Sequence, residues 1–316
     1  MTQGSALEGR LVVVTGGSGF LGQQVAQALL ARGARVRIAA RHPEKAFSLK
    51  PLANLGQLQF ARVDVSDRSD CTRVVAGADA VVSLVGSFEG NLDRLMGEAP
   101  GWLAEAAAAE GAAAFVHVSG IADPGEAEDP SPYACAKRLG ERRVLAAFPR
   151  ASILRPSILF GADDQFVNMF AGLIARLPVL PVFGPEARIQ PLFVADCAEA
   201  VARALENPGA HGGKIFEIAG PEVITMMDLN RRIAEAQGRH RTFLPVPDPI
   251  SAAFAMLPGT PMSSDQWRLL QAGSVADPAL PGMRELGLTP RPLGLFLDRW
   301  MTRYRRKGRF GDRAAG

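Results

Sequence analysis

The residues best suited to chemistry lie in one short sequence, Ser131-Pro132-Tyr133-Ala134-Cys135-Ala136-Lys137. Tyr133 and Lys137 are four positions apart, so on a helix their side chains share one face. An ammonium group beside a phenol favours the phenolate and lowers the pKa of the phenol toward values useful for proton transfer. Ser119 ends an earlier apolar run and is placed to hydrogen-bond a substrate carbonyl. This pattern predicts three catalytic residues, although the Tyr-x-x-x-Lys spacing by itself is a common coincidence.

A glycine-rich sequence near the N-terminus predicts a dinucleotide site. It follows the apolar run Leu11-Val12-Val13-Val14 and opens a segment with helical apolar spacing. Glycines at such a turn permit positive φ and a close approach of the backbone to a pyrophosphate, and the helix that follows presents free N–H groups to it. The predicted cofactor contacts in this turn are Gly16, Gly17, Ser18, Gly19, Phe20, Leu21 and Gly22.

The residue after the second predicted strand bears on the choice of cofactor. A site that prefers NAD usually has an acidic residue there, for the ribose hydroxyls, whereas this chain has Ala39-Ala40-Arg41-His42. The guanidinium of Arg41 suits a 2′-phosphate, so the sequence favours NADP(H) over NAD(H). The alternative is that Arg41 is an ordinary exposed loop arginine.

Two further turns are predicted to contact the cofactor. Asp64 follows the third strand and could accept a hydrogen bond from the adenine amino group, with the Val65 backbone at the ring edge. Asp67 directly precedes a predicted helix and is the better capping residue, which leaves Asp64 free. After the fourth strand, a glycine lets the main chain pass close to a ribose, although a simple turn is a nearly equal alternative. This last group of residues is Leu84, Val85 and Gly86.

The elements that must position these residues alternate between strand and helix, which predicts an α/β fold with a Rossmann-type, doubly wound parallel sheet. Strands are expected at 11–15, 35–39, 58–63, 80–84, 113–118 and 152–154, with helices at 20–32, 67–76, 92–110 and 132–148 and a short one after Pro43. Residues 1–156 are expected to form the nucleotide-binding domain, and 157–298 a smaller α/β lobe. A strand near Lys214–Ile218 should return to the sheet.

Composition and charge narrow the class of protein. The 316 residues contain no apolar run long enough for a membrane span and no recognisable secretion signal near the N-terminus. Three dispersed cysteines predict reduced thiols in a cytoplasmic protein, with no metal site; no nucleic-acid partner is expected. Residues 299–316 carry a formal charge of +6 and the rest −3, so this basic tail is either a contact for a membrane face or acidic protein, or a solvated terminus.

In motif order, the chain resembles the extended and atypical short-chain dehydrogenases/reductases from about Gly9 to Pro208. After the glycine turn, Asp64, Ser119 and the Tyr133/Lys137 pair come Arg155-Pro156-Ser157 and Gln190-Pro191-Leu192-Phe193-Val194-Ala195-Asp196. The resemblance implies that Pro156, Ser157 and Ile158 flank the nicotinamide, and that Tyr133 and Lys137 also contact the cofactor. Arg155 either lines the cleft or pairs with an acid near the sheet edge.

A narrower resemblance lies after residue 152. The sequences at 153–161 and 164–170, then Gln190–Val194 and the basic tail with Trp300 and Tyr304, are similar to the nucleotide-binding accessory subunit of respiratory complex I and its bacterial relatives. That resemblance implies a tightly held, structural NADPH, respiratory subunits as partners and a peripheral position on the inner face of the inner membrane. Only 14 positions separate Ser119 from Tyr133, a segment shorter than in sugar-modifying relatives.

Two other functions stay open at this point. One is an active NAD(P)-dependent reductase, epimerase or dehydratase, with Tyr133 as acid and base, Lys137 lowering its pKa and Ser119 polarising the substrate. The other is a sensor that reads the NADP/NADPH ratio through a degenerate site.

Overall fold

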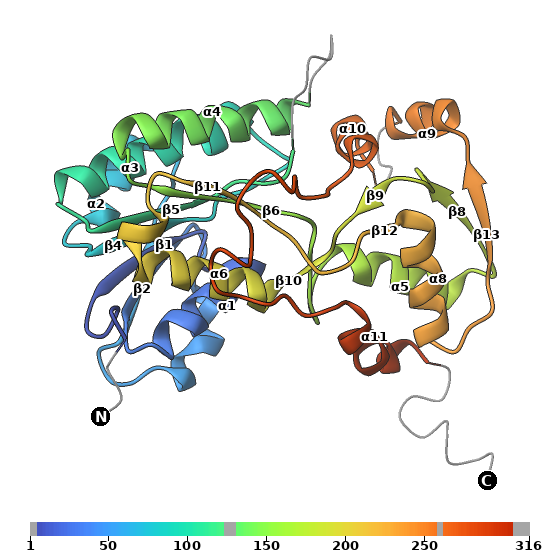
Figure 1. Cartoon of the computed structure of the whole chain (residues 1–316), viewed down its shortest axis with the longest axis horizontal. Helices are drawn as coiled ribbons and strands as arrows, with labels where there is room; N and C mark the ends of the chain where they lie inside the picture. Colours follow the sequence, from blue (N-terminus) through green and yellow to red (C-terminus); the bar gives the residue numbers. More distant parts are fainter. Residues whose placement is uncertain (1–4, 123–130, 258–261, 306–316) are drawn as a thin grey trace. The chain divides into compact units, whose positions relative to one another are not determined.

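A computed structural model describes residues 5–122, 131–257 and 262–305 (Figure 1). The chain divides into two compact units. Unit 1 comprises residues 1–156, 194–218 and 277–289, and unit 2 comprises 157–193, 219–276 and 290–316. The strand expected near Lys214–Ile218 is present as β11 (Ile215–Ile218) and belongs to unit 1.

Unit 1 contains a seven-stranded parallel sheet in the order β11-β6-β5-β4-β1-β2-β3, which confirms the predicted fold class. All residues of β1, β4 and β5 are buried, as expected for strands covered on both faces. The chain order reverses at β1, which lies between β2 and β4, and ligands of such sheets bind where this reversal occurs. The other strands are β1 (Leu11–Thr15), β2 (Arg35–Ala40), β3 (Leu58–Arg62), β4 (Ala80–Ser83), β5 (Ala114–Val118) and β6 (Ser152–Pro156).

Helices cover both faces of this sheet (Figure 1). One face carries α2 (Arg68–Val75), α3 (Ala99–Ala109) and α4 (Pro132–Ala147), which pack in series, and the π-helical turn η2 (Asp93–Glu98) leads into α3. The other carries α1 (Phe20–Leu30) and α6 (Val194–Glu206), which pack against each other. Unit 1 also includes η1 (Pro43–Leu52) and α7 (Pro208–His211).

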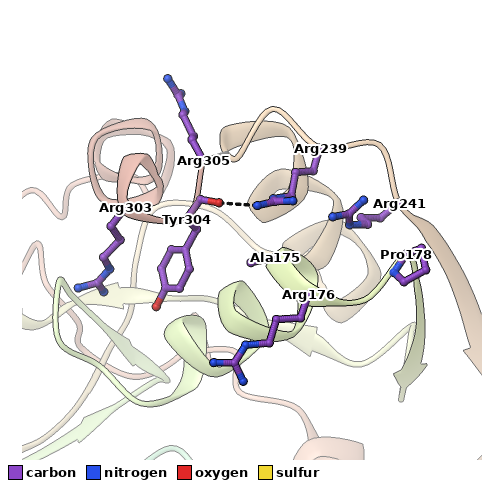
Figure 2. Close-up of a pocket in the computed structure, with 8 residues that line it drawn as sticks. All are labelled: Ala175, Arg176, Pro178, Arg239, Arg241, Arg303, Tyr304 and Arg305. Atoms are coloured by element: carbon purple, nitrogen blue, oxygen red, sulfur yellow. Dashed lines mark hydrogen bonds between the residues drawn. The ribbon is translucent and has the colours of Figure 1, made fainter. Parts of the chain in front are cut away.

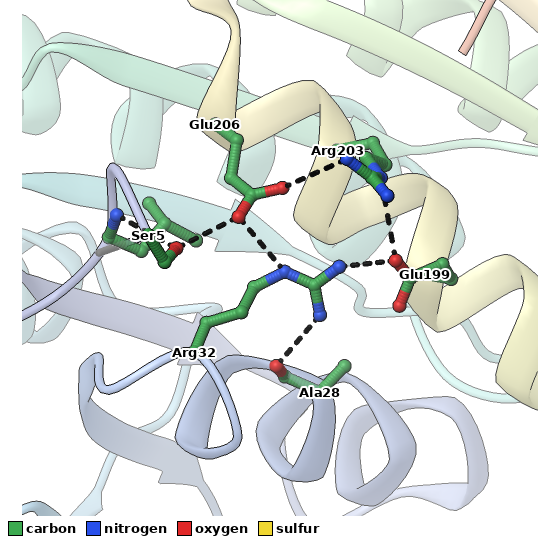
Figure 3. Close-up of polar contacts among 7 residues, drawn as sticks. Ser5, Ala28, Arg32, Glu199, Arg203 and Glu206 are labelled. Atoms are coloured by element: carbon green, nitrogen blue, oxygen red, sulfur yellow. Dashed lines mark hydrogen bonds and ion pairs between the residues drawn. The ribbon is translucent and has the colours of Figure 1, made fainter. Parts of the chain in front are cut away.

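A network of ion pairs joins the end of α1 to α6 (Figure 3). The Arg32 guanidinium contacts the carboxylates of Glu199 and Glu206, with 3.2 Å between Arg32 Nε and Glu206 Oε1. Ser5 Oγ donates to the same Glu206 oxygen over 2.8 Å. The chain therefore links its first described residue to a helix formed some two hundred positions later.

Unit 2 consists of short strand pairs and helices. Strand β8 (Val179–Phe183) pairs in parallel with β13 (Thr242–Val246), β7 (Leu159–Phe160) with β10 (Leu192–Phe193), and β9 (Arg188–Ile189) pairs antiparallel with β12 (Ile224–Thr225). Helix α8 (Met226–Ala236) begins with a Thr225/Asp228 capping box and packs against α5 (Phe166–Arg176) and α11 (Gly294–Met301). Helices α9 (Asp248–Ala255) and α10 (Ser264–Ala272) and the turn η3 (Thr302–Tyr304) complete this unit.

The first part of the basic tail is ordered within unit 2. Met301 is buried in the core that α5 and α8 form, and residues 299–304 continue α11 into η3. The basic residues Arg306, Lys307, Arg309 and Arg313 lie outside the described residues. In the part of the chain that the structure describes, no helix combines the length and apolar character needed to cross a bilayer.

Candidate nucleotide site

The glycine turn after β1 is tight enough to exclude side chains. A Cβ added to Gly22 would lie 2.3 Å from Gly16 O, and one added to Gly17 would lie 2.8 Å from Val14 O. Gly16 has φ of +76°, a conformation that favours glycine. Among the described residues no side chain caps the N-terminus of α1, so its first N–H groups face the turn. This cradle of backbone suits a pyrophosphate.

The turn after β4 lies directly against the glycine turn. A Cβ on Gly16 would come within 3.3 Å of the Leu84 carbonyl carbon and the Val85 nitrogen. Gly86 lies close to the catalytic candidates, since a Cβ there would be 3.6 Å from Lys137 Nζ. The predicted contacts at 16–22 and 84–86 therefore share one edge of the sheet.

Helix α4 positions Tyr133 and Lys137 in its first two turns. Ser131 caps the helix by accepting a hydrogen bond from Ala134 N over 3.2 Å, and Pro132 occupies its first turn. Lys137 Nζ donates to Val85 O and Val118 O, each at 3.3 Å. Tyr133 stacks on Phe88 with 4.6 Å between ring centroids, and its ring centroid is 5.7 Å from Lys137 Nζ. The predicted pair thus lies beside the turn that ends β4.

Burial lowers the pKa of Lys137 to about 8, while the nearby Glu141 carboxylate acts in the opposite direction. A pKa of about 8 leaves the ammonium form in the majority at pH 7. The Lys137 side chain is thus a buried cation that points at carbonyl oxygens, a suitable position for binding ribose hydroxyls and for polarising a phenol.

Ser119 follows β5 and is buried, with its backbone nitrogen donating to Leu154 O over 2.8 Å. Its hydroxyl finds no hydrogen bond of good geometry among the described residues, but lies near enough to Glu141 to help lower the pKa of that carboxyl. Residues 123–130, most of the short segment between Ser119 and Tyr133, lie outside the described residues.

Arg41 and Asp64 are the residues predicted to contact the adenosine part of the cofactor, and their surroundings differ. Arg41 is exposed directly after β2, and its charge contributes to lowering the pKa of Asp64. The larger cause of that lowered pKa is Ser66, which donates its N–H and hydroxyl to Asp64 Oδ1 over 2.9 and 2.7 Å. Asp67 caps α2 as predicted, through Ser69 N. Asp64 closes a turn of its own through Oδ1, and its contact with the adenine stays a prediction. The Val65 side chain is buried beside it.

Sequence reasoning missed Glu141, which lies one helical turn after Lys137 with a side chain only 5% exposed. Arg155 donates to it from Nε over 3.0 Å and from Nη2 over 2.7 Å, and also pairs with Glu217 at 3.3 Å. Burial raises the pKa of Glu141, but hydrogen bonds from Arg155 and the charge of Arg138 outweigh it and hold the pKa below its usual value. Of the two alternatives for Arg155, pairing with an acid is the one observed. The spacing Tyr133, Lys137, Glu141 was the available signal.

His117 lies in β5 and is fully buried, with Nδ1 3.3 Å from Ser83 Oγ. Burial and the charge of Lys137 lower the pKa of His117 to about 3, so the ring is neutral at pH 7. His117 is thus a core residue. No group of three or more His, Cys, Asp or Glu side chains able to hold a metal ion is present within the described ranges.

The residues expected near the nicotinamide span the boundary between the units. Pro156 ends β6 in unit 1, and its carbonyl accepts from Ile121 N over 3.0 Å. Ser157 and Ile158 belong to unit 2, where Ser157 Oγ donates to Gln190 O and Ile158 O accepts from Leu192 N.

Comparison with known proteins places this chain in a family. Residues 12–219 match the sequence model of the "NAD dependent epimerase/dehydratase family". Subunit 9 of the NADH dehydrogenase (ubiquinone) 1 alpha subcomplex, mitochondrial, from Rattus norvegicus is 31% identical over 304 residues, covering 92% of this chain and 79% of the rat protein. A ceramide reductase from Caulobacter vibrioides is 29% identical over 246 residues, 76% of this chain and 74% of that protein.

A solved structure shares the fold. The NADPH-dependent quinone oxidoreductase of Escherichia coli, in complex with NADPH, matches with a TM-score of 0.73 and 19% identity over 91% of this chain and 99% of that one. With its glycine cradle at the switch point of the sheet and the family match across most of unit 1, the chain belongs to the NAD-dependent epimerase/dehydratase family.

Proposed function

We propose that the protein is an NADP(H)-binding accessory or assembly-associated subunit of respiratory complex I, in which the nucleotide is a structural ligand. The observation that carries the proposal is the similarity to the rat complex I subunit over 92% of this chain. The glycine turn suits the pyrophosphate, and the exposed guanidinium of Arg41 directly after β2 supports a preference for a 2′-phosphate. A ligand that binds only the folded state at 100 to 1,000 times its Kd would add about 3–4 kcal/mol of stability.

Purification from native membranes without added cofactor tests both halves of this proposal. We expect the protein to retain NADPH, seen by absorbance and by release on denaturation, and to co-purify with respiratory subunits. Recovery of a nucleotide-free protein without respiratory partners would overturn the proposal.

Arg41→Ala should lower the affinity for NADP(H) by about 10- to 100-fold, because hydrogen bonds to a charged group contribute about 1.5–3 kcal/mol. The affinity for NAD(H), which lacks the 2′-phosphate, should change by less than about threefold. Titration calorimetry with both nucleotides makes the comparison. Arg35→Ala is the matched control, since Arg35 is an exposed arginine at the other end of β2. Equal losses for both nucleotides would contradict a role for Arg41 in cofactor choice.

The second candidate function is catalysis by an NAD(P)-dependent reductase, epimerase or dehydratase. The observation that favours it is the Tyr133–Lys137 arrangement beside the glycine turn, together with the similarity to a ceramide reductase. The cofactor would accept or supply hydride. Tyr133 would donate or remove the substrate proton, Lys137 would hold the ribose and stabilise the phenolate, and Ser119 would orient the substrate carbonyl.

If the protein turns over a carbonyl or quinone substrate with NADPH, Tyr133→Phe should reduce that rate by about 10²–10⁴-fold through loss of general acid–base catalysis. Tyr304→Phe removes the only other tyrosine hydroxyl in the chain and serves as control. Oxidation of NADPH is followed by its absorbance. An unchanged rate in the Tyr133 variant would remove the assigned role.

A further inference from the structure

Unit 2 contains an open pocket of about 720 Å³ whose lining is unusually basic (Figure 2). Five arginines and one tyrosine contribute to it, and no carboxylate is among its lining residues in the part of the chain that the structure describes. They come from three segments: the end of α5, the loop that enters β13, and the end of η3. The residues are Arg176, Arg239, Arg241, Arg303, Tyr304 and Arg305.

Backbone carbonyls hold several of these guanidinium groups in place. Arg239 Nη2 donates to Tyr304 O over 2.9 Å, Arg241 Nε to Ile174 O over 2.8 Å, and Arg305 Nε to Ala236 O over 3.1 Å. These carbonyl oxygens orient the guanidinium groups. Arg239 and Arg241 come from the same loop before β13, and both contribute to the lining of the pocket (Figure 2). Cations that line one pocket repel one another, so an anion bound in the pocket would stabilise this arrangement.

Phosphate fits this lining because a guanidinium can hold two of its oxygens at once. The pocket volume is in the range of small-ligand sites. Arg303 also lies 3.9 Å from Asp163, but that acid is 89% exposed, so solvent screens much of the pair.

The exposed face of α5 indicates which kind of molecule would carry such a phosphate. Met169, Leu173 and Leu177 are each about 40% exposed, and their spacing of four residues places them on one side of the helix. Arg176, which lines the pocket, lies on the same exposed side. An apolar stripe next to clustered arginines is typical of a surface that contacts anionic lipid, with acyl chains against the leucines and headgroups against the arginines.

We infer that this pocket binds the phosphate headgroup of an anionic phospholipid, and that the adjoining α5 stripe contacts its acyl chains. This binding does not require a bound nucleotide. It assigns membrane contact to α5 and the loop before β13 as well as to the basic terminal segment. It deepens the proposed function as a subunit of a respiratory complex, on which it rests, and vesicle binding can fail separately from complex I association.

Vesicle co-sedimentation of the full-length protein tests the inference, with phosphatidylcholine vesicles alone or with about one third phosphatidylglycerol, at 0.15 M salt. We expect binding only to the anionic vesicles. Arg239→Gln/Arg241→Gln should weaken that binding by about 25-fold, from about fivefold for each arginine near an anionic surface. Arg176→Gln, on an exposed helix end, should weaken it by about fivefold and cannot disturb the carbonyl contacts of the other two.

The matched control is Arg188→Gln/Arg231→Gln, which removes two exposed arginines of unit 2 outside the pocket and should change binding by less than about threefold. Leu173→Ser/Leu177→Ser should also reduce vesicle binding. Vesicle binding that is unaffected by the pocket variants would overturn the inference in favour of the terminal basic residues. Binding of inorganic diphosphate in calorimetry without vesicle binding would instead indicate a soluble phosphate ester, and loss of respiratory partners with intact vesicle binding would separate the two proposals.

Discussion

Gly22→Ala is expected to lower the affinity for NADPH by about 10- to 100-fold and to destabilise the protein by about 1–3 kcal/mol. The new Cβ would lie 2.3 Å from Gly16 O and 2.6 Å from Gly17 Cα, distances that no relaxed Cβ contact reaches. Both neighbours are backbone atoms, so the turn itself must open. The open turn would move the N–H groups of α1 away from the pyrophosphate. Titration calorimetry and urea unfolding without nucleotide measure the two effects.

The sign of the change in stability distinguishes Gly22, in the glycine turn, from an ordinary helical glycine. Alanine in the interior of a helix is normally more favourable than glycine by about 1 kcal/mol. Gly172 lies in α5 with no described atom within 4 Å of an added Cβ, so Gly172→Ala should stabilise the protein and leave nucleotide binding unchanged. If Gly22→Ala behaved as the Gly172 variant does, the cradle would have no role in binding.

Acidification is expected to destabilise the protein from pH 6.5 downward. His117 readily takes up a proton in the unfolded chain, whereas its buried site in the folded protein disfavours the charged ring. Burial lowers the pKa of His117 to about 3, from 6.5 in the unfolded chain. Between these values the unfolded state binds one more proton, so the free energy of unfolding falls by about 1.4 kcal/mol per pH unit, or about 3 kcal/mol by pH 4.5. Glu141, whose pKa is held below 4.5, adds to the loss only below that pH.

Urea unfolding at pH 7.0, 5.5 and 4.5 checks the expectation. His117→Gln removes the titrating ring but keeps a polar side chain near Ser83, so this variant should lose less stability between pH 6.5 and 4.5 than the wild type. His240→Gln replaces an exposed histidine and should follow the wild type. Parallel pH profiles for the wild type and the His117 variant would show that the buried ring is not the acid-sensitive group.

The sequence predicted the sheet of unit 1 well because its central strands β1, β4 and β5 are buried on both faces. Such strands appear as short, nearly uninterrupted apolar runs, and the predicted and observed ends of β1 and β2 differ by one residue at most. The capped helix start at Ser131-Pro132 likewise placed Tyr133 and Lys137 on one helix, which the structure confirms. Their catalytic and cofactor roles stay predictions.

The strand pair β8 and β13 could not be predicted in the same way. Pro181 and Pro245 interrupt both segments, and proline in a strand is typical of an edge or a loop. A two-stranded ribbon with one exposed face tolerates them. The partners of Arg155 could not be predicted either, because Glu141 in α4 and Glu217 in β11 lie 14 and 62 positions away and only the tertiary structure brings them together.

Unit 1 is formed by three separate stretches of the chain, and this has a consequence for synthesis on the ribosome. Strand β6 ends at Pro156, but its neighbour β11 begins only at Ile215, and Glu217 N then donates to Pro281 O over 2.9 Å. While the intervening residues are translated, the nascent chain exposes an unpaired β6 edge, the kind of template on which other strands add. We therefore expect fragments that stop at residue 156 to aggregate, and the emerging chain to depend on chaperones until its last sheet strand has been made.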